Sequence, residues 1–374
     1  MSIGIIGGGV GGLTLARVLH VTGVDAVVYE REASRAARGQ GGTLDLHPET
    51  GQRAFRLAGL EAEFLGMARP EGQDMRLLDH TGAVLLREDV PDDAPMARPE
   101  VDRAALRAAL LDSLPAGTVR WGHEFQGAEP LAGGGYRVHF ASGAVADHEL
   151  IVGADGARSR VRRLVTDVRP HHTGVNHVEG TIPDPSPDLA DWLGRGSFLS
   201  MGDRRMLTAQ RVGDGHYRVA CIVRTPEDWL ASIPFDDPGR TRTALHALFD
   251  GWAPELTALI DRCAGGFEGR AIYTLPAGLT WPSVPGVTLV GDAAHLMPPY
   301  GEGANLAMLD GAELALALAT AEPAGAVKEY ETAMFDRAAE AAEESERIDE
   351  MLFAPDGAQR MLAFFSPREK TATS

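Results

Sequence analysis

Three glycines near the start of the chain have the spacing that lets a backbone bind a diphosphate. Gly7, Gly9 and Gly12 form a G-x-G-x-x-G pattern between an apolar run at residues 3–6 and apolar residues at helical spacing over 13–19. In such a strand–turn–helix unit, one glycine permits a tight turn, one lets the backbone approach the phosphates, and one lets helix and strand pack closely. The phosphates then lie on free N–H groups at the helix start. The pattern predicts a bound dinucleotide and leaves FAD and NAD as alternatives.

An acidic residue and a basic loop follow the next expected strand. Residues 26–29 are apolar, and Glu30 comes directly after them, where a carboxylate can accept hydrogen bonds from a ribose hydroxyl. The following loop is polar and glycine-rich, and it carries Arg31, Arg35 and Arg38. These arginines either meet the phosphates of the nucleotide or form a solvated charged run, and the pattern leaves both interpretations open.

Two later stretches place an aspartate in a glycine turn at the end of an apolar strand. The first, residues 150–156, ends in Gly-Ala-Asp-Gly and contains Asp155 and Gly156. The second, residues 287–292, ends in Gly-Asp and contains Asp292. Open α/β sheets bind ligands at the carboxyl ends of their strands, so we expect the second turn at a ligand crevice. For the first turn, an ordinary strand–turn–helix with the aspartate as a helix cap is the alternative.

A stiff loop leads from the second turn into another helix. Pro298 and the proline after it restrict this loop, and Gly301 and Gly303 let it turn closely. A helix is expected to begin near Ala304, so that its N-terminus points back at the same crevice.

Composition limits the class of protein. The chain has 374 residues, 44% hydrophobic and 24% charged, which is typical of a globular protein with a large core and favours two domains. A net charge of −18 argues against nucleic acid and anionic membranes as partners. We expect no membrane-spanning helix, no signal peptide and no metal site, and a cytoplasmic enzyme in which Cys221 and Cys263 are reduced and buried.

The second half of the chain changes character twice. Residues 172–275 alternate strand-like runs with proline-containing turns and contain no phosphate loop, which predicts an antiparallel sheet that could cover a pocket. Residues 322–354 are rich in alanine and glutamate with few helix breakers, which predicts one long helix spanning both domains.

Taken together, three motifs occur in a fixed order along most of the chain. They are the glycines of residues 7–12 with Glu30, the turn at 153–156, and the segment 291–303. This order resembles the class A flavoprotein monooxygenases, the para-hydroxybenzoate hydroxylase-like family. The resemblance implies an α/β fold with a Rossmann-like FAD-binding domain on a parallel sheet, an antiparallel-sheet substrate domain, and a long C-terminal bridging helix. The implied boundaries are 1–70, 98–170 and 276–320 for the FAD-binding domain, 71–97 and 171–275 for the substrate domain, and 321–366 for the C-terminal helix and tail.

Within this family, three stretches look most like the tetracycline-inactivating TetX-type enzymes: residues 41–47, 225–229 and 291–299. In the sheet expected to bind substrate, however, Phe198 and Arg218 stand where TetX-type enzymes place a glutamine and a histidine on tetracycline. The substrate therefore stays open among tetracyclines, other polyketide aromatics and small phenols.

The resemblance also implies roles for individual residues toward two cofactors, FAD and NADPH. Glu30 would bind the adenosine ribose, Arg103 the ribityl-phosphate region, and Asp292 a ribityl hydroxyl. Asp45 would lie near the flavin, and Arg38 would meet NADPH transiently. Asp155 and Gly156 belong to a motif tied to both cofactors. The other residues expected at the cofactor are Arg31, Gly291, Pro298, Gly301, Gly303, Ala304 and Asn305, and those expected at the substrate are Phe198, Arg218, Pro299, Tyr300 and Met361.

One departure from the family falls beside the expected flavin position. The family usually reads Gly-Gln-Gly where this chain has Gly301, Glu302 and Gly303. A carboxylate there would oppose negative charge on the flavin unless it points to solvent.

The implied reaction is hydroxylation of an aromatic or enolic, polyketide- or tetracycline-like molecule. The resemblance implies that NAD(P)H reduces FAD and that molecular oxygen reacts through a flavin C4a-hydroperoxide, with no side-chain nucleophile. The sequence does not encode the oligomeric state, and a monomer is the default expectation. Two alternatives remain: an FAD-dependent oxidase or reductase without oxygen insertion, and a non-catalytic flavoprotein that sequesters an aromatic ligand.

Overall fold

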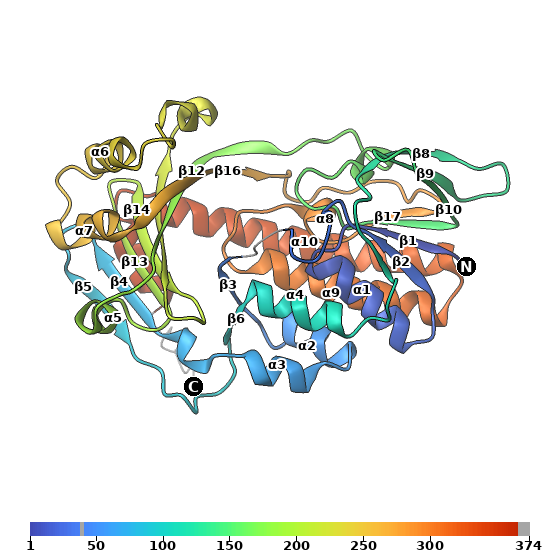
Figure 1. Cartoon of the computed structure of the whole chain (residues 1–374), viewed down its shortest axis with the longest axis horizontal. Coiled ribbons are helices and arrows are strands. Elements are labelled where there is room, and N and C mark those ends of the chain that lie inside the picture. The colour runs from blue at the N-terminus through green and yellow to red at the C-terminus, as the bar shows by residue number, and fades with distance from the viewer. Residues whose placement is uncertain (38–40, 366–374) are drawn as a thin grey trace, which may run out of the picture. The chain divides into compact units, whose positions relative to one another are not determined.

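The structure is a computed structural model that describes residues 1–37 and 41–365, and it divides into two compact units (Figure 1). Unit 1 comprises Met1–Ala68, Met96–His171 and Tyr273–Ser345. Unit 2 comprises Arg69–Pro95, His172–Ile272 and the C-terminal segment from Glu346. Each unit has its own hydrophobic core and is described by itself.

Unit 1 is built on a five-stranded parallel sheet with the order β17-β11-β1-β2-β7. The strands are β1 (Ile3–Ile6), β2 (Ala26–Tyr29), β7 (Val119–Arg120), β11 (Leu150–Gly153) and β17 (Val287–Leu289). Every residue of β1, β11 and β17 is buried, which is why these segments read as unbroken apolar runs in the sequence.

Two long helices of unit 1 pack against each other through small residues. They are α1 (Val10–Val21) and α9 (Glu302–Thr320). A Cβ atom on Gly11 would lie 2.8 Å from the Ala307 carbonyl oxygen, and one on Gly311 would lie 2.5 Å from the Gly11 carbonyl oxygen. Because Gly311 also meets Leu15 one turn further along α1, the helices run parallel and begin at the same end.

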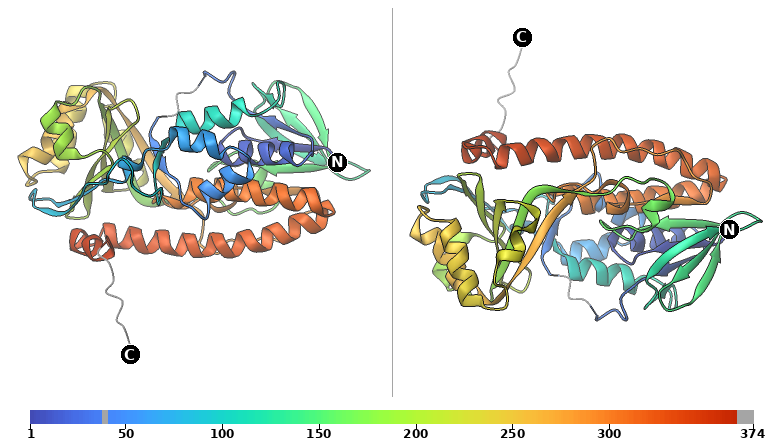
Figure 2. Two further views of the ribbon diagram at one scale, coloured as in Figure 1. Left: turned by 90° about the horizontal axis from the view of Figure 1, so that it is seen from below. Right: turned by 90° about the horizontal axis from the view of Figure 1, so that it is seen from above.

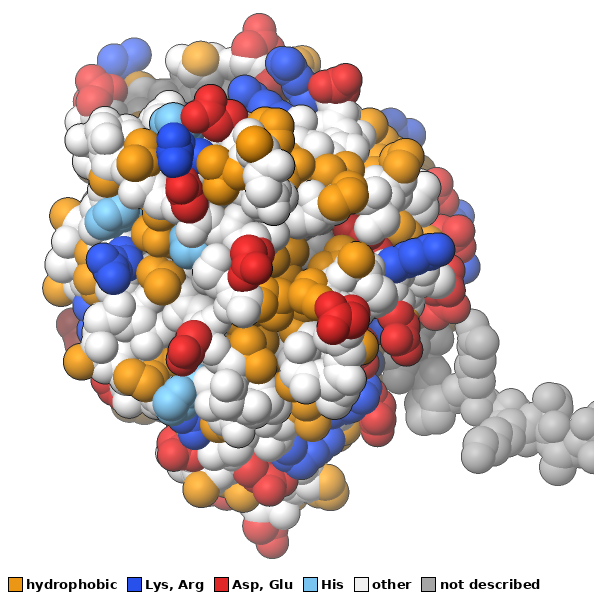
Figure 3. Space-filling view, turned by 90° about the vertical axis from the view of Figure 1, so that its right-hand side faces the viewer, with side chains coloured by type: hydrophobic (Ala, Val, Ile, Leu, Met, Phe, Trp, Pro, Cys, Tyr) orange, Lys and Arg blue, Asp and Glu red, His pale blue; other side chains and the backbone are white. Residues whose placement is uncertain are grey.

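Smaller elements complete unit 1. An antiparallel sheet has the order β10-β9-β8, and β3 pairs antiparallel with β6. Acidic, basic and apolar side chains are intermixed on the face that carries the N-terminus and β8–β10 (Figure 3). Helix α9 and the first part of α10 lie side by side (Figure 2), where Arg337 pairs with Glu313 at 2.7 Å. The remaining bounds are β3 (Thr43–Asp45), β6 (Glu100–Asp102), β8 (Phe125–Pro130), β9 (Tyr136–Phe140), β10 (Val145–His148), α2 (Gly51–Leu57), α3 (Glu61–Met67), α4 (Arg103–Asp112), η2 (Val161–Leu164), α8 (Asp292–His295) and α10 (Pro323–Leu352), whose residues from Glu346 onward belong to unit 2.

Unit 2 is built on a seven-stranded sheet with the order β16-β12-β15-β14-β13-β4-β5. Apart from the parallel pair β13 and β4, the strand pairs with a described register are antiparallel. Apolar side chains on one face pack in a single core with helices α5, α6 and α7, whereas α11 contacts β4, β5 and β13. The bounds are β4 (Met75–Asp79), β5 (Val84–Glu88), β12 (His171–Ile182), β13 (Ser197–Gly202), β14 (Arg205–Arg211), β15 (Tyr217–Arg224), β16 (Ala264–Thr274), η1 (Pro70–Gln73), η3 (Glu227–Ser232), α5 (Pro187–Leu193), α6 (Pro238–Leu248), α7 (Pro254–Arg262) and α11 (Gly357–Phe365).

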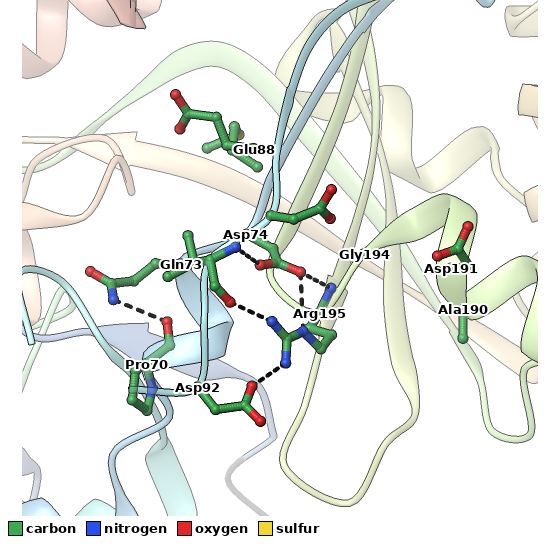
Figure 4. Close-up of polar contacts among 12 residues, drawn as sticks. Pro70, Gln73, Asp74, Glu88, Asp92, Ala190, Asp191, Gly194 and Arg195 are labelled. Carbon is green, nitrogen blue, oxygen red and sulfur yellow. Dashed lines mark hydrogen bonds and ion pairs between the residues drawn. The ribbon is translucent and has the colours of Figure 1, made fainter. Parts of the chain in front are cut away.

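A buried aspartate joins two of the three chain segments that form unit 2. The carboxylate of Asp74 accepts hydrogen bonds from the Val90 N–H at 2.6 Å and from the Arg195 N–H at 3.0 Å. The Arg195 guanidinium bonds the same carboxylate and pairs with Asp92 (Figure 4). Two parts of the chain more than 100 residues apart are thereby fixed at the start of β4 and β13.

The predicted α/β class, with a parallel sheet in one part and a mostly antiparallel sheet in another, is confirmed. Cys221 and Cys263 are both buried and unpaired, as expected, and burial raises the pKa of the Cys263 thiol to about 12. Within the described chain, no helix is both long and apolar enough to cross a membrane.

Candidate functional site

The first glycine turn leaves an open, uncapped helix start at the carboxyl end of β1. Gly7 has φ +114°, and a Cβ atom there would lie 2.2 Å from the Ala154 carbonyl oxygen, so only glycine fits. Gly9 is the N-cap of α1, and apart from its two chain neighbours no described residue has an atom within 4 Å of its Cβ position. The first turn of α1 contains no acidic residue. The backbone N–H groups at this helix start therefore face free space that suits an anion.

Glu30 lies beside this turn and is only 7% exposed. One carboxylate oxygen accepts a hydrogen bond from the Gly8 N–H at 2.7 Å, and the other accepts one from the Glu32 N–H at 3.0 Å. A carboxylate has about four acceptor positions, so Glu30 keeps capacity for ligand hydroxyls. Arg31 is exposed, and Arg38 lies outside the described residues.

Arg107 holds the glycine turn from the other side, and sequence reasoning gave it no role. Its Nε donates to the Gly8 carbonyl oxygen at 3.0 Å, and its guanidinium lies 5.4 Å from the centre of the Trp121 ring. Its position one helical turn after Arg103 was visible in the sequence, but its partners were not.

The two aspartate turns lie at the ends of the neighbouring strands β11 and β17 and differ in their hydrogen bonds. The Asp155 carboxylate accepts from the Ser159 hydroxyl at 2.5 Å, the Arg160 N–H at 2.7 Å and the Val161 N–H at 3.3 Å. The half-buried Asp292 carboxylate accepts no hydrogen bond from the described residues. Burial raises the pKa of Asp292, against the opposing charges of nearby histidine and arginine groups.

Arg162 joins these two turns. This buried guanidinium donates to the carbonyl oxygens of Asp292 at 2.8 Å, Ala293 at 2.7 Å and Ala157 at 3.1 Å. The described hydrogen bonds of Arg162 are therefore with the backbone of the site.

A buried ionic network centred on Asp310 of α9 supports the Asp292 turn. Asp310 on α9 accepts from the Gly291 N–H at 3.0 Å and from His295 Nε2 at 2.6 Å, and Arg337 lies 3.3 Å from its other oxygen. Although burial disfavours its charged form, the pKa of His295 is raised by Asp310. The sequence motif contains His295 but gave no indication of this network.

Asn305 fastens the start of α9 to the end of β3. Its side-chain oxygen accepts from the N–H groups of His47 at 3.0 Å and Gly51 at 3.2 Å. Its side-chain amide donates to the carbonyl oxygens of Asp45 at 2.8 Å and Gly301 at 2.9 Å. Both polar atoms of Asn305 are therefore engaged within the protein, and its predicted contact with a cofactor stays a prediction.

Three ionisable side chains meet at the same place. His47 Nε2 lies 2.9 Å from an Asp45 oxygen, and His47 Nδ1 lies 3.3 Å from a Glu302 oxygen. Burial favours the neutral imidazole, but the two carboxylates outweigh it and raise the pKa of His47 to about 9. A Cβ atom on Gly303 would lie 3.7 Å from Asp292, so this cluster and the Asp292 turn flank the same helix start.

The residues predicted to bind substrate in unit 2 lie on different faces of its sheet. Phe198 is fully buried, 4.9 Å from the Trp192 ring on α5, and belongs to the core with α6 and α7. Phe198 pairs across the sheet with Ala209, which pairs with Val219. Arg218, one residue along, points to the opposite face. The two side chains therefore cannot line one pocket on this sheet, and the geometry argues against Phe198.

Arg218 belongs to a charged cluster on that opposite face. Its guanidinium pairs with Glu179, which also pairs with Arg270 and lies 3.9 Å from His177. Burial alone would raise the pKa of Glu179, but the surrounding cations and hydrogen bonds hold it well below its usual range.

The other predicted site residues differ in exposure. Met361 on α11 and Pro298 are buried, and Tyr300 is half-buried. Pro299 and Arg103 are exposed.

The unit 1 residues fit a dinucleotide with additional hydroxyl groups. An uncapped helix start with open space can take a diphosphate, Glu30 can accept ribose hydroxyls, and the Asp292 carboxylate has no hydrogen-bond partner among the described residues. Over residues 1–37 and 41–365, no group of three His, Cys, Asp or Glu residues is arranged to hold a metal. Fold and site together define a Rossmann-type dinucleotide-binding protein.

Comparison with known proteins gives the family. The sequence matches the FAD binding domain family over residues 1–243 and 283–345. It is 31% identical to Monooxygenase asqM of Emericella nidulans, over 84% of this chain and 82% of that one. It is 30% identical to 3-amino-4-hydroxybenzoate 2-monooxygenase PtnB3 of Streptomyces platensis, over 96% of this chain and 90% of that one. The chain belongs to the FAD binding domain family, and the resemblance to the class A flavoprotein monooxygenases is confirmed.

Solved structures share the fold. Klebsiella pneumoniae HpxO complexed with FAD and uric acid has a TM-score of 0.80 at 22% identity, covering 97% of this chain and 91% of that one. Tetracycline destructase Tet(51) has a TM-score of 0.72 at 18% identity, covering 97% and 95%. This chain therefore shares its fold with a protein crystallised with uric acid and with a tetracycline destructase. The fold alone does not identify the substrate.

Proposed function

We propose that this FAD-dependent monooxygenase uses NAD(P)H and molecular oxygen to hydroxylate a small aromatic or enolic molecule. The observation that supports this most directly is Asp292. Its carboxylate lies half-buried at the sheet edge without a hydrogen bond from the described residues, so its oxygens are open to a hydrogen-bond donor on a ligand. A ribityl hydroxyl of FAD is the donor that we assign to it.

The adenosine ribose and the diphosphate of FAD each have a proposed place in unit 1. Glu30 would accept the adenosine ribose hydroxyls, and the N–H groups at the start of α1 would hold the diphosphate. Arg107 and Arg162 would keep the glycine turn and the two aspartate turns in position through their carbonyl contacts. When bound, FAD supplies the redox chemistry that activates oxygen, and the protein supplies orientation and charge.

Unit 2 is proposed to bind the substrate, with Arg218 as one contact. Within the described chain, Arg218 and Arg270 share one carboxylate, Glu179, so the cluster carries excess positive charge. That charge would suit an anionic phenolate, enolate or carboxylate. The relatives include proteins named for aminohydroxybenzoate and for urate, both small aromatic acids. We propose a substrate of this kind and keep polyketides and tetracyclines as further members of the test panel.

The test measures product and cofactor together. The purified protein is incubated with NADPH or NADH, isotopically labelled oxygen gas, and a panel of hydroxybenzoates, urate, polyketide phenols and tetracyclines. We expect faster NAD(P)H oxidation with one compound class and a product that has gained one labelled oxygen atom. Hydrogen peroxide as the sole oxygen product with every compound would overturn the proposal.

One observation favours a second candidate, an FAD-dependent oxidase. Glu302 lies in the first turn of α9, beside the position proposed for the flavin, and negative charge there opposes the charge that FAD acquires on reduction. An oxidase would give peroxide in proportion to the NAD(P)H consumed, without a hydroxylated product.

A further inference from the structure

The start of α9 combines an acidic residue with half-buried backbone N–H groups. Glu302 is the first residue of this 19-residue helix. A carboxylate at this position is well placed to bind the free N–H groups of its own first turn. In the described part of the chain, the N–H groups of Glu302, Gly303 and Ala304 donate to no residue outside the helix. The described partner of the Glu302 carboxylate is instead His47, at 3.3 Å.

His47 is held in place independently of its side chain. Its N–H donates to the buried Asn305 oxygen, and its ring lies between Asp45 of β3 and Glu302 of α9. These two carboxylates are the charged groups that face the imidazole from the elements packed around it. The ring is 12% exposed, so its contacts with both carboxylates are only weakly screened by water.

We propose that His47 is a positioning residue that holds the Glu302 carboxylate away from the first N–H groups of α9, which leaves this helix start free for the negatively polarised part of FAD. The inference rests on the proposed function, because it takes the start of α9 to lie beside FAD. It explains how this chain accommodates a carboxylate next to the cofactor. His47 offsets part of the charge of Glu302 and keeps the carboxylate off the N–H groups, so the helix start keeps more of its positive potential.

The pair makes a specific double-variant prediction for FAD affinity. In His47→Asn, Glu302 loses its counter-charge, and we expect the apoprotein to bind FAD about tenfold more weakly near neutral pH. Glu302→Gln removes the carboxylate charge that His47 is proposed to hold away from the helix, and we expect an FAD affinity within about twofold of the wild type. In the double variant His47→Asn/Glu302→Gln, affinity should return to within about threefold of Glu302→Gln alone. Fluorescence titration of apoprotein with FAD measures all three.

A matched control and a second readout separate positioning from general damage. His246 pairs with Asp261 at 2.8 Å on the surface of unit 2, and His246→Asn should leave FAD affinity unchanged. The midpoint potential of bound FAD should fall in His47→Asn and recover in the double variant. NMR titration of the apoprotein, with the His47 signal assigned by its absence in His47→Asn, should show a lower midpoint for His47 in Glu302→Gln than in the wild type.

The outcomes are distinct. A double variant that binds FAD as weakly as His47→Asn would overturn the inference, because His47 would then act without Glu302. An unchanged His47 titration in Glu302→Gln would overturn it without any use of FAD. Failure of the wild-type apoprotein to bind FAD would overturn the proposed function together with this inference, whereas either of the first two results leaves the proposed function intact.

Discussion

The Asp155 turn and the Asp292 turn look alike in the sequence but differ in their hydrogen bonds. Both follow strands of the parallel sheet, both contain glycine, and the strands are neighbours. The Asp155 carboxylate accepts hydrogen bonds from three donors of the turn that follows it, whereas the Asp292 carboxylate accepts none from the described residues. The first aspartate fixes the fold, and the second remains available to a ligand.

This difference separates residues that build the site from residues that use it. Asn305 belongs with Asp155, because its oxygen and its amide are both engaged by the backbone. Asp292 stands apart, and Arg162 connects the two turns through their carbonyl oxygens. Substitutions should therefore sort these residues by whether they lower the stability of the apoprotein or its affinity for FAD.

The largest loss of stability is expected from Asn305→Ala. The substitution leaves the N–H groups of His47 and Gly51 and the carbonyl oxygens of Asp45 and Gly301 without their buried partner. We expect a cost of about 3–5 kcal/mol in the free energy of unfolding. Urea denaturation of the apoprotein, followed by circular dichroism, measures it. A cost below about 1 kcal/mol would show that water replaces these hydrogen bonds and that Asn305 does not hold α9 and β3 together.

Asp155→Ala comes next. Three donors of one turn lose their acceptor, and we expect a cost of about 2–3 kcal/mol in the same measurement. Asp155→Asn keeps one acceptor oxygen and should cost less. The comparison fails if Asp155→Ala leaves stability unchanged while FAD affinity falls, because Asp155 would then belong with the ligand-binding residues.

Much of this architecture is predictable from the sequence because it is local. The unbroken apolar runs of β1, β11 and β17 indicate strands covered on both faces, and the glycine turn after β1 follows from spacing. The alternating strands of unit 2 follow from their pattern in the same way.

The partners of each polar residue are not predictable in this way. Arg162 and Asn305 reach groups more than 100 residues away, and no spacing rule encodes such a contact. The face of Phe198 depends on the register that places it beside Ala209, and a register cannot be read from one strand alone. Residue types therefore predict the site, whereas only the tertiary structure separates residues held by the protein itself from candidate ligand contacts.

The His47 cluster predicts a pH dependence of apoprotein stability. The folded-state pKa of His47 is raised to about 9 from an ordinary value of 6.5, so the protonated imidazole stabilises the folded state. This contribution is complete below pH 6.5 and is lost as the pH rises through 9. The shift corresponds to at most about 3 kcal/mol, and water near the ring reduces this to about 1–2 kcal/mol.

Matched variants test the assignment of that pH dependence to His47. Urea denaturation across this pH range should show the decline in the wild type and a much smaller decline in His47→Asn. An identical decline in both proteins would place the titrating group elsewhere.

The smallest effect on stability is expected from Asp292→Asn. This variant also tests the difference between the Asp155 and Asp292 turns most directly. Burial already disfavours the charged carboxylate, so removal of the charge should change apoprotein stability by less than about 0.5 kcal/mol. FAD affinity should nevertheless fall about 10- to 100-fold, because a ligand hydroxyl loses a charged acceptor worth about 1.5–3 kcal/mol. Glu340→Gln, at an exposed position of α10, serves as the matched control that removes one carboxylate charge and should leave FAD affinity unchanged. Unchanged FAD retention by Asp292→Asn would place Asp292 with the structural residues, and the distinction between the two turns would no longer explain where FAD binds.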